Sequence, residues 1–201
     1  MEQGGRRDKG RIFVVSGPSG SGKTTLLGSL FKNKGFKKNL VKSVSLTTRP
    51  KRSGERDRKD YFFITRQEFL RRKKAKKILE WTKYLGYYYA TPRELVDKHL
   101  EAGRHIILCL DLKGAVRIKR LYPRNTITIF IVPPSLRALK RRIEGRSHET
   151  KSEEVNRRIG LAKEELAASR LYDYRIENRS LLQAVRQLEG VILTETNNIA
   201  R

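Results

Sequence analysis

The stretch that decides the fold is Gly17-Pro-Ser-Gly-Ser-Gly-Lys-Thr24, which is a complete G-x-x-x-x-G-K-[ST] sequence. The apolar run from Ile12 to Val15 precedes it and predicts a buried strand, while Leu26, Leu27 and Leu30 follow it at helical spacing. Between a strand and a helix, glycines let backbone N–H groups surround a phosphate, and the helix N-terminus adds partial positive charge. The stretch therefore predicts an α/β fold with a loop that binds a nucleoside triphosphate.

Two side chains of this loop have distinct chemical roles. The Lys23 ammonium is expected to reach the β- and γ-phosphates, and the Thr24 hydroxyl is expected to coordinate Mg²⁺. Lys23 is therefore a candidate catalytic residue and Thr24 the candidate metal ligand. The residues expected to contact the triphosphate are Gly17, Ser19, Gly20, Ser21, Gly22, Lys23, Thr24 and Thr25.

The chain is strongly basic, since 46 lysines and arginines stand against 21 acidic residues, for a formal net charge of +25. This excess predicts non-specific, salt-dependent association with polyanions. Most of the charge is more typical of a solvated surface than of specific nucleic-acid recognition. Residues 66–77 are the best candidate for an additional anion-binding surface, but Phe69 is their sole aromatic residue, which argues against single-strand binding.

Composition also restricts where the protein works. No apolar run approaches the ~18 residues of a membrane helix, and the segment from Met1 to Lys9 lacks the apolar stretch of a signal peptide. The single cysteine, Cys109, lies in the apolar run from Ile106 to Leu110 and is expected to be a buried, reduced core residue. These features favour a cytoplasmic protein of one domain with inserted subdomains, either a monomer or a homodimer.

Strands and helices are expected to alternate along the chain. Apolar runs at Ile12 to Val15, Ile106 to Leu110 and Ile127 to Val132 predict parallel strands that are buried on both faces. The fold class is therefore α/β, with a parallel sheet flanked by helices. The residues expected to cap the helices are Thr65, Thr91, Ser135, Thr150 and Ser180.

Residues 41–90 interrupt this alternation and predict a small mixed subdomain inserted into the core. Short strands are expected at Val41 to Ser45, Tyr61 to Ile64, Ile78 to Trp81 and Tyr84 to Tyr89, with one helix among them. The aromatic side chains expected in the core of this subdomain are Phe62, Phe63, Trp81 and Tyr88.

A series of motifs follows the phosphate loop in a fixed order. They are Ser43-Val-Ser-Leu-Thr-Thr-Arg-Pro-Lys-Arg52, Gly54-Glu55, Lys59-Asp-Tyr61, Leu79-Glu-Trp81, Tyr88-Tyr-Ala-Thr-Pro92, Pro133-Pro-Ser135 and Glu144-Gly-Arg146. This series resembles the guanylate kinase family over residues 10–195. The resemblance implies transfer of a phosphoryl group from ATP to GMP, and use of dGMP as a second acceptor, with Mg²⁺ as the metal.

The resemblance also implies a division of the chain. A basic arm (1–9) precedes a guanylate-kinase-like domain (10–195), and a short tail (196–201) follows it. The core of the domain spans 10–37 and 97–195, the GMP-binding insert about 38–96, and a helical lid about 142–158. The lid would bring Arg142, Arg146 and Arg158 over the ATP, where cationic groups stabilise the transferring phosphoryl group.

The acceptor nucleotide offers two features for recognition. Its dianionic phosphate matches Arg49, Arg52 and the hydroxyls of Tyr61 and Tyr89, since arginine binds phosphate in a bidentate fashion. Guanine presents two adjacent N–H donors, which a carboxylate can accept together. The residues expected to read the base are Glu80, Ser45, Thr91 and Asp111.

Asp111 also ends an apolar strand, as a Mg²⁺ ligand would, and both roles stay open. The chain departs from the family's pattern at Ala90, Cys109 and Lys113, where glycine, aspartate and glutamine are usual. The loss of one carboxylate at Cys109 could weaken metal binding, and the methyl group of Ala90 could crowd the nucleotide.

Other functions explain fewer of the motifs. A GTPase would need an N-K-x-D motif, which the sequence lacks. A catalytically silent module that binds acidic or phosphorylated peptides would not need Lys23 and Thr24. A related kinase with a different acceptor would not need Glu80 and Ser45.

Overall fold

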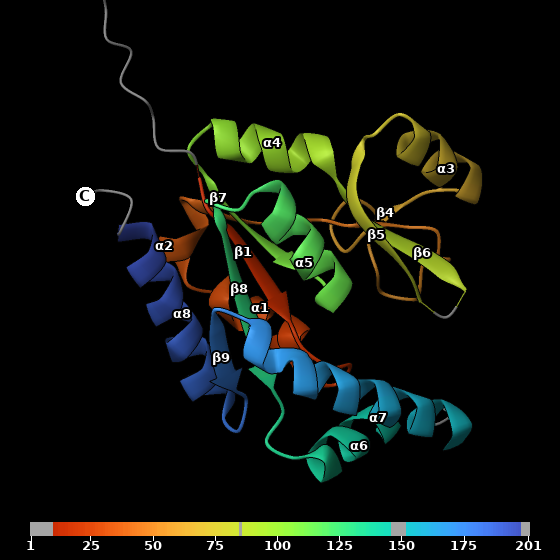
Figure 1. Cartoon of the computed structure of the whole chain (residues 1–201), viewed down its shortest axis with the longest axis vertical. Helices are drawn as coiled ribbons and strands as arrows, with labels where there is room; N and C mark the ends of the chain where they lie inside the picture. The colour runs from red at the N-terminus through yellow and green to blue at the C-terminus, as the bar shows by residue number, and fades with distance from the viewer. Residues whose placement is uncertain (1–9, 85, 146–151, 198–201) are drawn as a thin grey trace, which may run out of the picture. The chain divides into compact units, whose positions relative to one another are not determined.

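The computed structural model describes residues 10–84, 86–145 and 152–197 and has the predicted α/β fold (Figure 1). Its strands are β1 (Ile12–Ser16), β2 (Leu40–Lys42), β3 (Leu46–Thr47), β4 (Phe62–Phe63), β5 (Ile78–Tyr84), β6 (Tyr87–Pro92), β7 (His105–Cys109), β8 (Thr126–Val132) and β9 (Tyr174–Glu177). Its helices are α1 (Lys23–Leu30), α2 (Lys34–Lys37), α3 (Arg66–Lys74), α4 (Arg93–Glu101), α5 (Leu112–Leu121), α6 (Leu136–Glu144), α7 (Ser152–Ala167) and α8 (Leu181–Asn197), with a 3₁₀ turn η1 (Ala168–Leu171).

The strands form two sheets. The larger sheet has the order β2-β7-β1-β8-β9, and the smaller has the order β4-β3-β6-β5. In the larger sheet β2 runs parallel to β7, and β8 runs parallel to β9. The predicted parallel sheet and its three apolar strands are therefore confirmed.

One predicted strand belongs to a different sheet from the one expected. The segment from Val41 to Ser45 was expected among the strands of the insert, but β2 ends at Lys42 and pairs with β7, Leu40 lying opposite His105. A short apolar segment carries no sign of its partner strand, because that partner lies far along the chain.

The predicted helix caps have mixed outcomes. Thr65 accepts a hydrogen bond from the Glu68 N–H and Ser135 accepts one from the Ala138 N–H, so both caps are confirmed. The Thr91 cap is wrong, because α4 begins after Pro92 and has no side-chain cap. Thr91 lies in β6 instead, where its hydroxyl donates to Glu80 on β5. The expected cap at Thr150 lies outside the described residues.

The chain divides into two compact units, of which unit 1 comprises residues up to 12, 40–108 and 113–126. The smaller sheet of this unit has one apolar face, which packs against α3 (Figure 1). Its buried residues are Leu46, Phe69, Ile78 and Ala90. Thr91 follows Ala90 on β6 and therefore points to the opposite face, because side chains alternate along a strand. Glu80 pairs with Thr91 and shares its face, and a register shift between Ile78 and Glu80 interrupts the alternation on β5.

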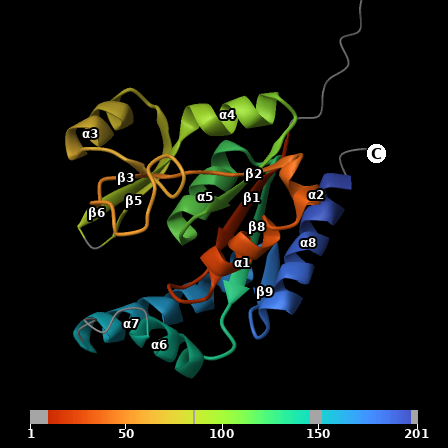
Figure 2. The ribbon, with the colours of Figure 1, turned by 180° about the vertical axis from the view of Figure 1, so that it is seen from behind.

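Unit 2 comprises residues 13–39, 109–112 and 127–201. Helix α1 packs against α8 (Figure 2), and the Leu26, Leu27 and Leu30 side chains predicted to form its apolar face are buried. Helices α6 and α7 pack together through Leu139, Ile143, Val155 and Ala162.

Two apolar side chains lie nearer to solvent than predicted. Cys109 is exposed at the end of β7, although its neighbours Leu108 and Leu110 are both buried. Trp81, expected in the core, is 42% exposed. Its ring meets Phe69 and Tyr88 only edge-on, at centroid distances of 6.0 and 5.7 Å.

A hydrogen-bonded pair joins β8 to the start of β9. The Thr128 hydroxyl donates to Asp173 Oδ2 at 2.8 Å and accepts from the Asp173 N–H at 3.0 Å. Thr128 is buried. Loss of its hydroxyl would remove one acceptor from the Asp173 N–H, while Asp173 Oδ2 still accepts the Thr128 N–H at 2.8 Å.

We predict that Thr128→Val lowers the free energy of unfolding by about 1 kcal/mol. The melting temperature of a chain of this size should then fall by about 2–4 °C. Thr128→Ser keeps the hydroxyl and is the matched control. Equal thermal melting curves for the two variants would contradict the prediction.

Candidate active site

The phosphate loop closes tightly between β1 and α1, and two of its glycines are required by the backbone. Gly17 has φ = 140°, and a Cβ atom there would lie 2.5 Å from the Ile131 carbonyl oxygen. Gly22 has φ = 95°, and a Cβ atom there would lie 2.3 Å from Asn178 Nδ2. Residues with a side chain rarely adopt these angles, so the loop depends on glycine for its shape.

The side chains of the loop lie where phosphate binding requires them. Lys23 Nζ donates to the carbonyl oxygens of Gly17 and Pro18, at 2.5 and 3.0 Å, and therefore lies over the loop. Helix α1 begins at Lys23, with Thr24 and Thr25 exposed in its first turn. The positive end of this helix and the Lys23 ammonium thus act on the same region.

Asn178, which directly follows β9, fixes the loop from a distant part of the sequence. Its side-chain Nδ2 donates to the Ser21 carbonyl oxygen at 2.8 Å, and its backbone N–H donates to the Val132 carbonyl oxygen at 2.8 Å. Asn178 is buried, so this contact joins the end of β9 to the loop.

A cavity of about 400 Å³ lies beside the loop, on the side of Asn178. This volume falls within the range of small-molecule sites. Its lining residues include Gly22, Thr25, Arg142, Asn178 and Arg179. The cavity can therefore accept a polar group that is attached to a phosphate on the loop.

Two of the three predicted lid arginines are described. Arg142 lies on α6 and lines this cavity. Arg158 lies on α7, where Nη2 donates to Glu154, while its buried Nε has no hydrogen-bond partner among the described residues. Arg146 lies outside the described residues, as does most of the connection between these helices.

Two carboxylates lie in unit 2 with the loop. Burial raises the pKa of Glu165 on α7, the Lys23 charge lowers it, and the Asp111 charge raises it. Each charge acts on Glu165, so the three side chains occupy one electrostatic environment. Asp111 itself is half-buried.

The donor atoms available here suit Mg²⁺. They are hard oxygens, from the Thr24 hydroxyl and the Asp111 and Glu165 carboxylates. Among the described residues, no three His, Cys, Asp or Glu side chains lie close enough to hold a metal ion by themselves. Mg²⁺ commonly keeps several waters and completes its shell with substrate phosphates, so the residues fit this ion.

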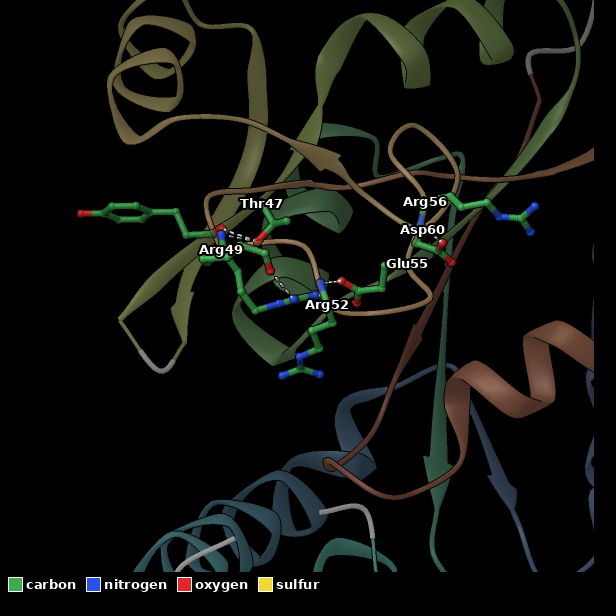
Figure 3. Close-up of polar contacts among 8 residues, drawn as sticks. Thr47, Arg49, Arg52, Glu55, Arg56 and Asp60 are labelled. Atoms are coloured by element: carbon green, nitrogen blue, oxygen red, sulfur yellow. Dashed lines mark hydrogen bonds and ion pairs between the residues drawn. The ribbon is translucent and has the colours of Figure 1, made fainter. Parts of the chain in front are cut away.

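A second group of predicted residues surrounds Arg49 in unit 1 (Figure 3). Arg49 Nη2 forms a 2.7 Å ion pair with Glu55, and Nη1 donates to the Pro50 carbonyl oxygen at 2.6 Å. Glu55 also accepts the Arg52 backbone N–H at 2.8 Å. Burial lowers the pKa of Arg49, but hydrogen bonds to Glu55 and Tyr89 outweigh burial, so the net shift is upward.

The predicted tyrosines lie beside this arginine. The guanidinium carbon of Arg49 is 5.6 Å from the centroid of the Tyr61 ring, and the rings of Tyr61 and Tyr89 are 5.9 Å apart. The Arg52 side chain is exposed. The structure therefore brings Arg49, Tyr61 and Tyr89 together and holds the backbone of Arg52 close by.

The predicted base-reading residues of unit 1 lie on the polar face of the smaller sheet. Glu80 is 7% exposed, and one of its oxygens accepts the Thr91 hydroxyl at 2.6 Å. Ser45, half-buried, directly precedes β3. Asp111, the fourth predicted residue, belongs to unit 2 instead.

The methyl group of Ala90 does not point to this polar face. Ala90 lies in the apolar cluster on the α3 side of the sheet, between Tyr89 and Thr91 on the strand. This placement argues against crowding of the nucleotide by the Ala90 methyl group, since side chains alternate between the two faces of a strand.

Three residues of the site have no role predicted from the sequence. Glu55 was quoted within a motif, but its contact with Arg49 depends on the fold of the loop between them. Asn178 and Glu165 lie more than a hundred residues beyond the phosphate loop. The one sequence signal for Asn178 is a polar residue directly after the short strand β9, whose sequence is Tyr-Arg-Ile-Glu.

We predict that Glu55→Gln lowers the stability of the protein in a pH-dependent way. The hydrogen bond to Arg49 lowers the pKa of Glu55, so its contribution exists above the unfolded-state pKa and disappears as pH falls through the folded-state pKa. Near pH 7 the variant should melt about 2–4 °C below the parent, and this difference should shrink steadily as the pH falls below the unfolded-state pKa and through the lower folded-state pKa.

Glu101→Gln, at an exposed site on α4, is the control for this measurement. Thermal melting across the pH range should show no such convergence for it. A Glu55→Gln deficit of constant size at all pH values would contradict the ion-pair interpretation.

Known proteins are similar in sequence to this chain along nearly its whole length. The guanylate kinase family matches residues 9–195. The guanylate kinase of Thermotoga maritima is 40% identical over 193 residues, which cover 96% of this chain and 91% of that protein. The guanylate kinase of a Synechococcus strain is 41% identical over 184 residues, covering 92% and 82%.

A solved structure agrees with the sequence relatives. The crystal structure of guanylate kinase from Anaplasma phagocytophilum superposes with a TM-score of 0.76 at 30% identity, covering 94% of this chain and 87% of that chain. Among the described residues, no helix has the length and apolar character needed to cross a membrane. The chain belongs to the guanylate kinase family and is a nucleoside-monophosphate kinase, a phosphotransferase.

Proposed function

We propose that this kinase transfers the γ-phosphoryl group of ATP to GMP, forming ADP and GDP. The observation that carries the proposal is the polar face of the smaller sheet, where a buried carboxylate, Glu80, accompanies the phosphate-binding candidates Arg49, Tyr61 and Tyr89. A carboxylate suits guanine and a cluster of arginine and tyrosine suits phosphate. dGMP is proposed as a second acceptor, because it presents the same base and phosphate groups to these residues.

Glu80 selects the base because its carboxylate offers two hydrogen-bond acceptors and no donor. The N1–H and 2-amino groups of guanine donate to the carboxylate, while Thr91 orients that carboxylate by donating to one oxygen. Ser45, which directly precedes β3, assists Glu80 in binding the base. Adenine carries an acceptor at N1, so AMP would leave buried acceptors facing each other, which costs much of the binding energy.

Arg49 binds the acceptor phosphate in a position fixed before binding. Its ion pair with Glu55 and its bond to the Pro50 carbonyl restrict the guanidinium, so little rotamer entropy is lost when phosphate arrives. Arg52 and the hydroxyls of Tyr61 and Tyr89 supply further donors.

Residues of unit 2 bind the donor. The phosphate loop holds the triphosphate of ATP. Lys23 then moves from the loop carbonyls to the terminal phosphates of ATP. The cavity beside Asn178 takes the attached nucleoside, with Arg142 against it. Arg142, Arg146 and Arg158 neutralise the charge that spreads over the transferring group. The attacking atom is an oxygen of an anionic phosphate, so no strong general base is needed.

Thr24 and Asp111 are the residues proposed to hold Mg²⁺, with Glu165 nearby. A Mg²⁺ ion held by these residues would supply positive charge to offset that of the donor phosphates. Asp111 is assigned to this role because it shares its environment with Lys23 and Glu165. A silent peptide-binding module is not favoured, since the phosphate loop is complete and the relatives are kinases. We expect the enzyme to work in cytoplasmic purine nucleotide metabolism.

We predict ADP release that depends on the acceptor. With ATP and Mg²⁺, a coupled assay should respond to GMP and dGMP and remain near background with AMP, CMP and UMP. Lys23→Ala should lower kcat at least about 100-fold, because removal of one preorganised charge at the transferring group has this order of effect. A full response to AMP, or full activity of Lys23→Ala, would contradict the proposal.

We predict that Glu80→Gln lowers kcat/KM for GMP by about 100-fold while changing kcat/KM for AMP far less. The amide presents one donor and one acceptor, so it fits guanine worse and adenine no worse. Steady-state kinetics with both acceptors measures the ratio. Glu94→Gln, at an exposed position of α4, is the matched control and should behave as the parent. An equal loss for both acceptors in Glu80→Gln would assign Glu80 to structure rather than to base selection.

A further inference from the structure

A basic surface with one exposed aromatic ring lies on the side of the smaller sheet that faces α3. Seven of the residues 66–77 are lysine or arginine, and Glu68 is their sole acid. Arg71 and Arg72 pair with Glu68 at 2.7 and 2.6 Å. The remaining members, together with Trp81, form what we call the α3–Trp81 surface: Arg66, Leu70, Lys73, Lys74, Lys76, Lys77 and Trp81.

The structure adds to this surface the ring that the local sequence lacks. Trp81 lies on β5, outside residues 66–77, yet Lys73 Nζ lies 4.0 Å from the centroid of its ring. Trp81 is 42% exposed and Leu70 on α3 is 47% exposed. A cationic helix and an accessible aromatic ring therefore share one surface.

Lys76 occupies a backbone position that favours glycine. Its φ angle is 54°, in the left-handed region that commonly ends a helix. Hydrogen bonds from Lys76 N to the Lys73 carbonyl and from Lys77 N to the Arg72 carbonyl close this turn. A lysine in this backbone conformation is less favourable than a glycine would be. Its presence here indicates that its positive charge has a function on this surface.

We propose that the α3–Trp81 surface binds single-stranded nucleic acid without sequence specificity. The lysines contact successive phosphates, and a base stacks on Trp81 in place of the Lys73 ammonium, which turns to a phosphate. Two exposed apolar side chains, Leu70 and Trp81, are few for insertion into a lipid surface. The combination of charge and an aromatic ring favours a single strand over a duplex, whose bases are already stacked.

This binding is separate from the proposed kinase site. Trp81 and Glu80 are neighbours on β5, so their side chains point to opposite faces of the sheet. A nucleic acid on the α3–Trp81 surface need not displace GMP from the polar face.

The test uses the single tryptophan of the chain as its reporter. A 12-residue oligouridylate without terminal phosphates is titrated into the full-length protein in the presence of saturating GMP. We expect quenching of tryptophan fluorescence and tighter binding than for a duplex of equal length. Duplex binding as tight or tighter, without quenching, would overturn the proposal in favour of a simple charge effect. Binding to phosphatidylserine vesicles but not to the oligonucleotide would overturn it in favour of a membrane.

Charge variants then locate the surface. The triple variant Lys73→Gln, Lys74→Gln, Lys77→Gln should lower the slope of log affinity against log salt by about 2, since each phosphate contact on a single strand contributes about 0.7. The matched control removes three exposed charges elsewhere in unit 1, as Lys98→Gln, Arg104→Gln, Arg120→Gln. Equal slopes for the two variants would overturn the assignment.

Two single variants separate binding from folding. Lys76→Gly should weaken binding several-fold while the protein melts at the same or a higher temperature, because glycine fits the turn. Trp81→Leu should weaken binding about tenfold, as measured by anisotropy of a labelled oligonucleotide. Both variants should keep the parent's kinase activity. Parental affinity in Trp81→Leu would overturn the stacking part of the proposal.

Discussion

Each cation proposed to bind phosphate has an acceptor close to it in the sequence, and this constraint recurs throughout the candidate site. Lys23 donates to the carbonyl oxygens of its own loop, Arg49 pairs with Glu55, and Arg158 pairs with Glu154. Each partner lies within a few residues of its cation. A local acceptor restricts the side chain and keeps like charges apart, so the entropy of ordering is spent during folding and not during binding.

The two faces of the smaller sheet differ in character, because side chains alternate between them along each strand. Glu80, Tyr89 and Thr91 share the polar face, and Trp81 and Ala90 share the face that packs toward α3. A shift of the β5–β6 register by one residue would bury Trp81 among the polar groups and expose Glu80. The Thr91–Glu80 hydrogen bond and the apolar cluster beneath Ala90 oppose such a shift from opposite faces.

The phosphate loop, the three apolar strands and the caps at Thr65 and Ser135 were predictable from the sequence, because each depends on residues within about five positions of one another. The predicted Thr91 cap failed for a long-range reason, since pairing with β5 gave its hydroxyl another partner. Cys109 was misplaced because an apolar run does not show which of its members faces solvent, and its neighbours Leu108 and Leu110 are buried. Most of the site residues followed from motifs, but Asn178 contacts Ser21 across 157 positions, and no local pattern encodes that contact.

The fate of the γ-phosphorus tests the central claim most directly, because ADP release alone does not distinguish transfer from hydrolysis. ³¹P NMR of the enzyme with ATP, Mg²⁺ and GMP follows that atom. The γ-phosphate resonance of ATP should disappear as the β-phosphate resonance of GDP grows in equal amount. Accumulation of inorganic phosphate with GMP left unchanged would contradict the claim that this chain is a kinase for GMP.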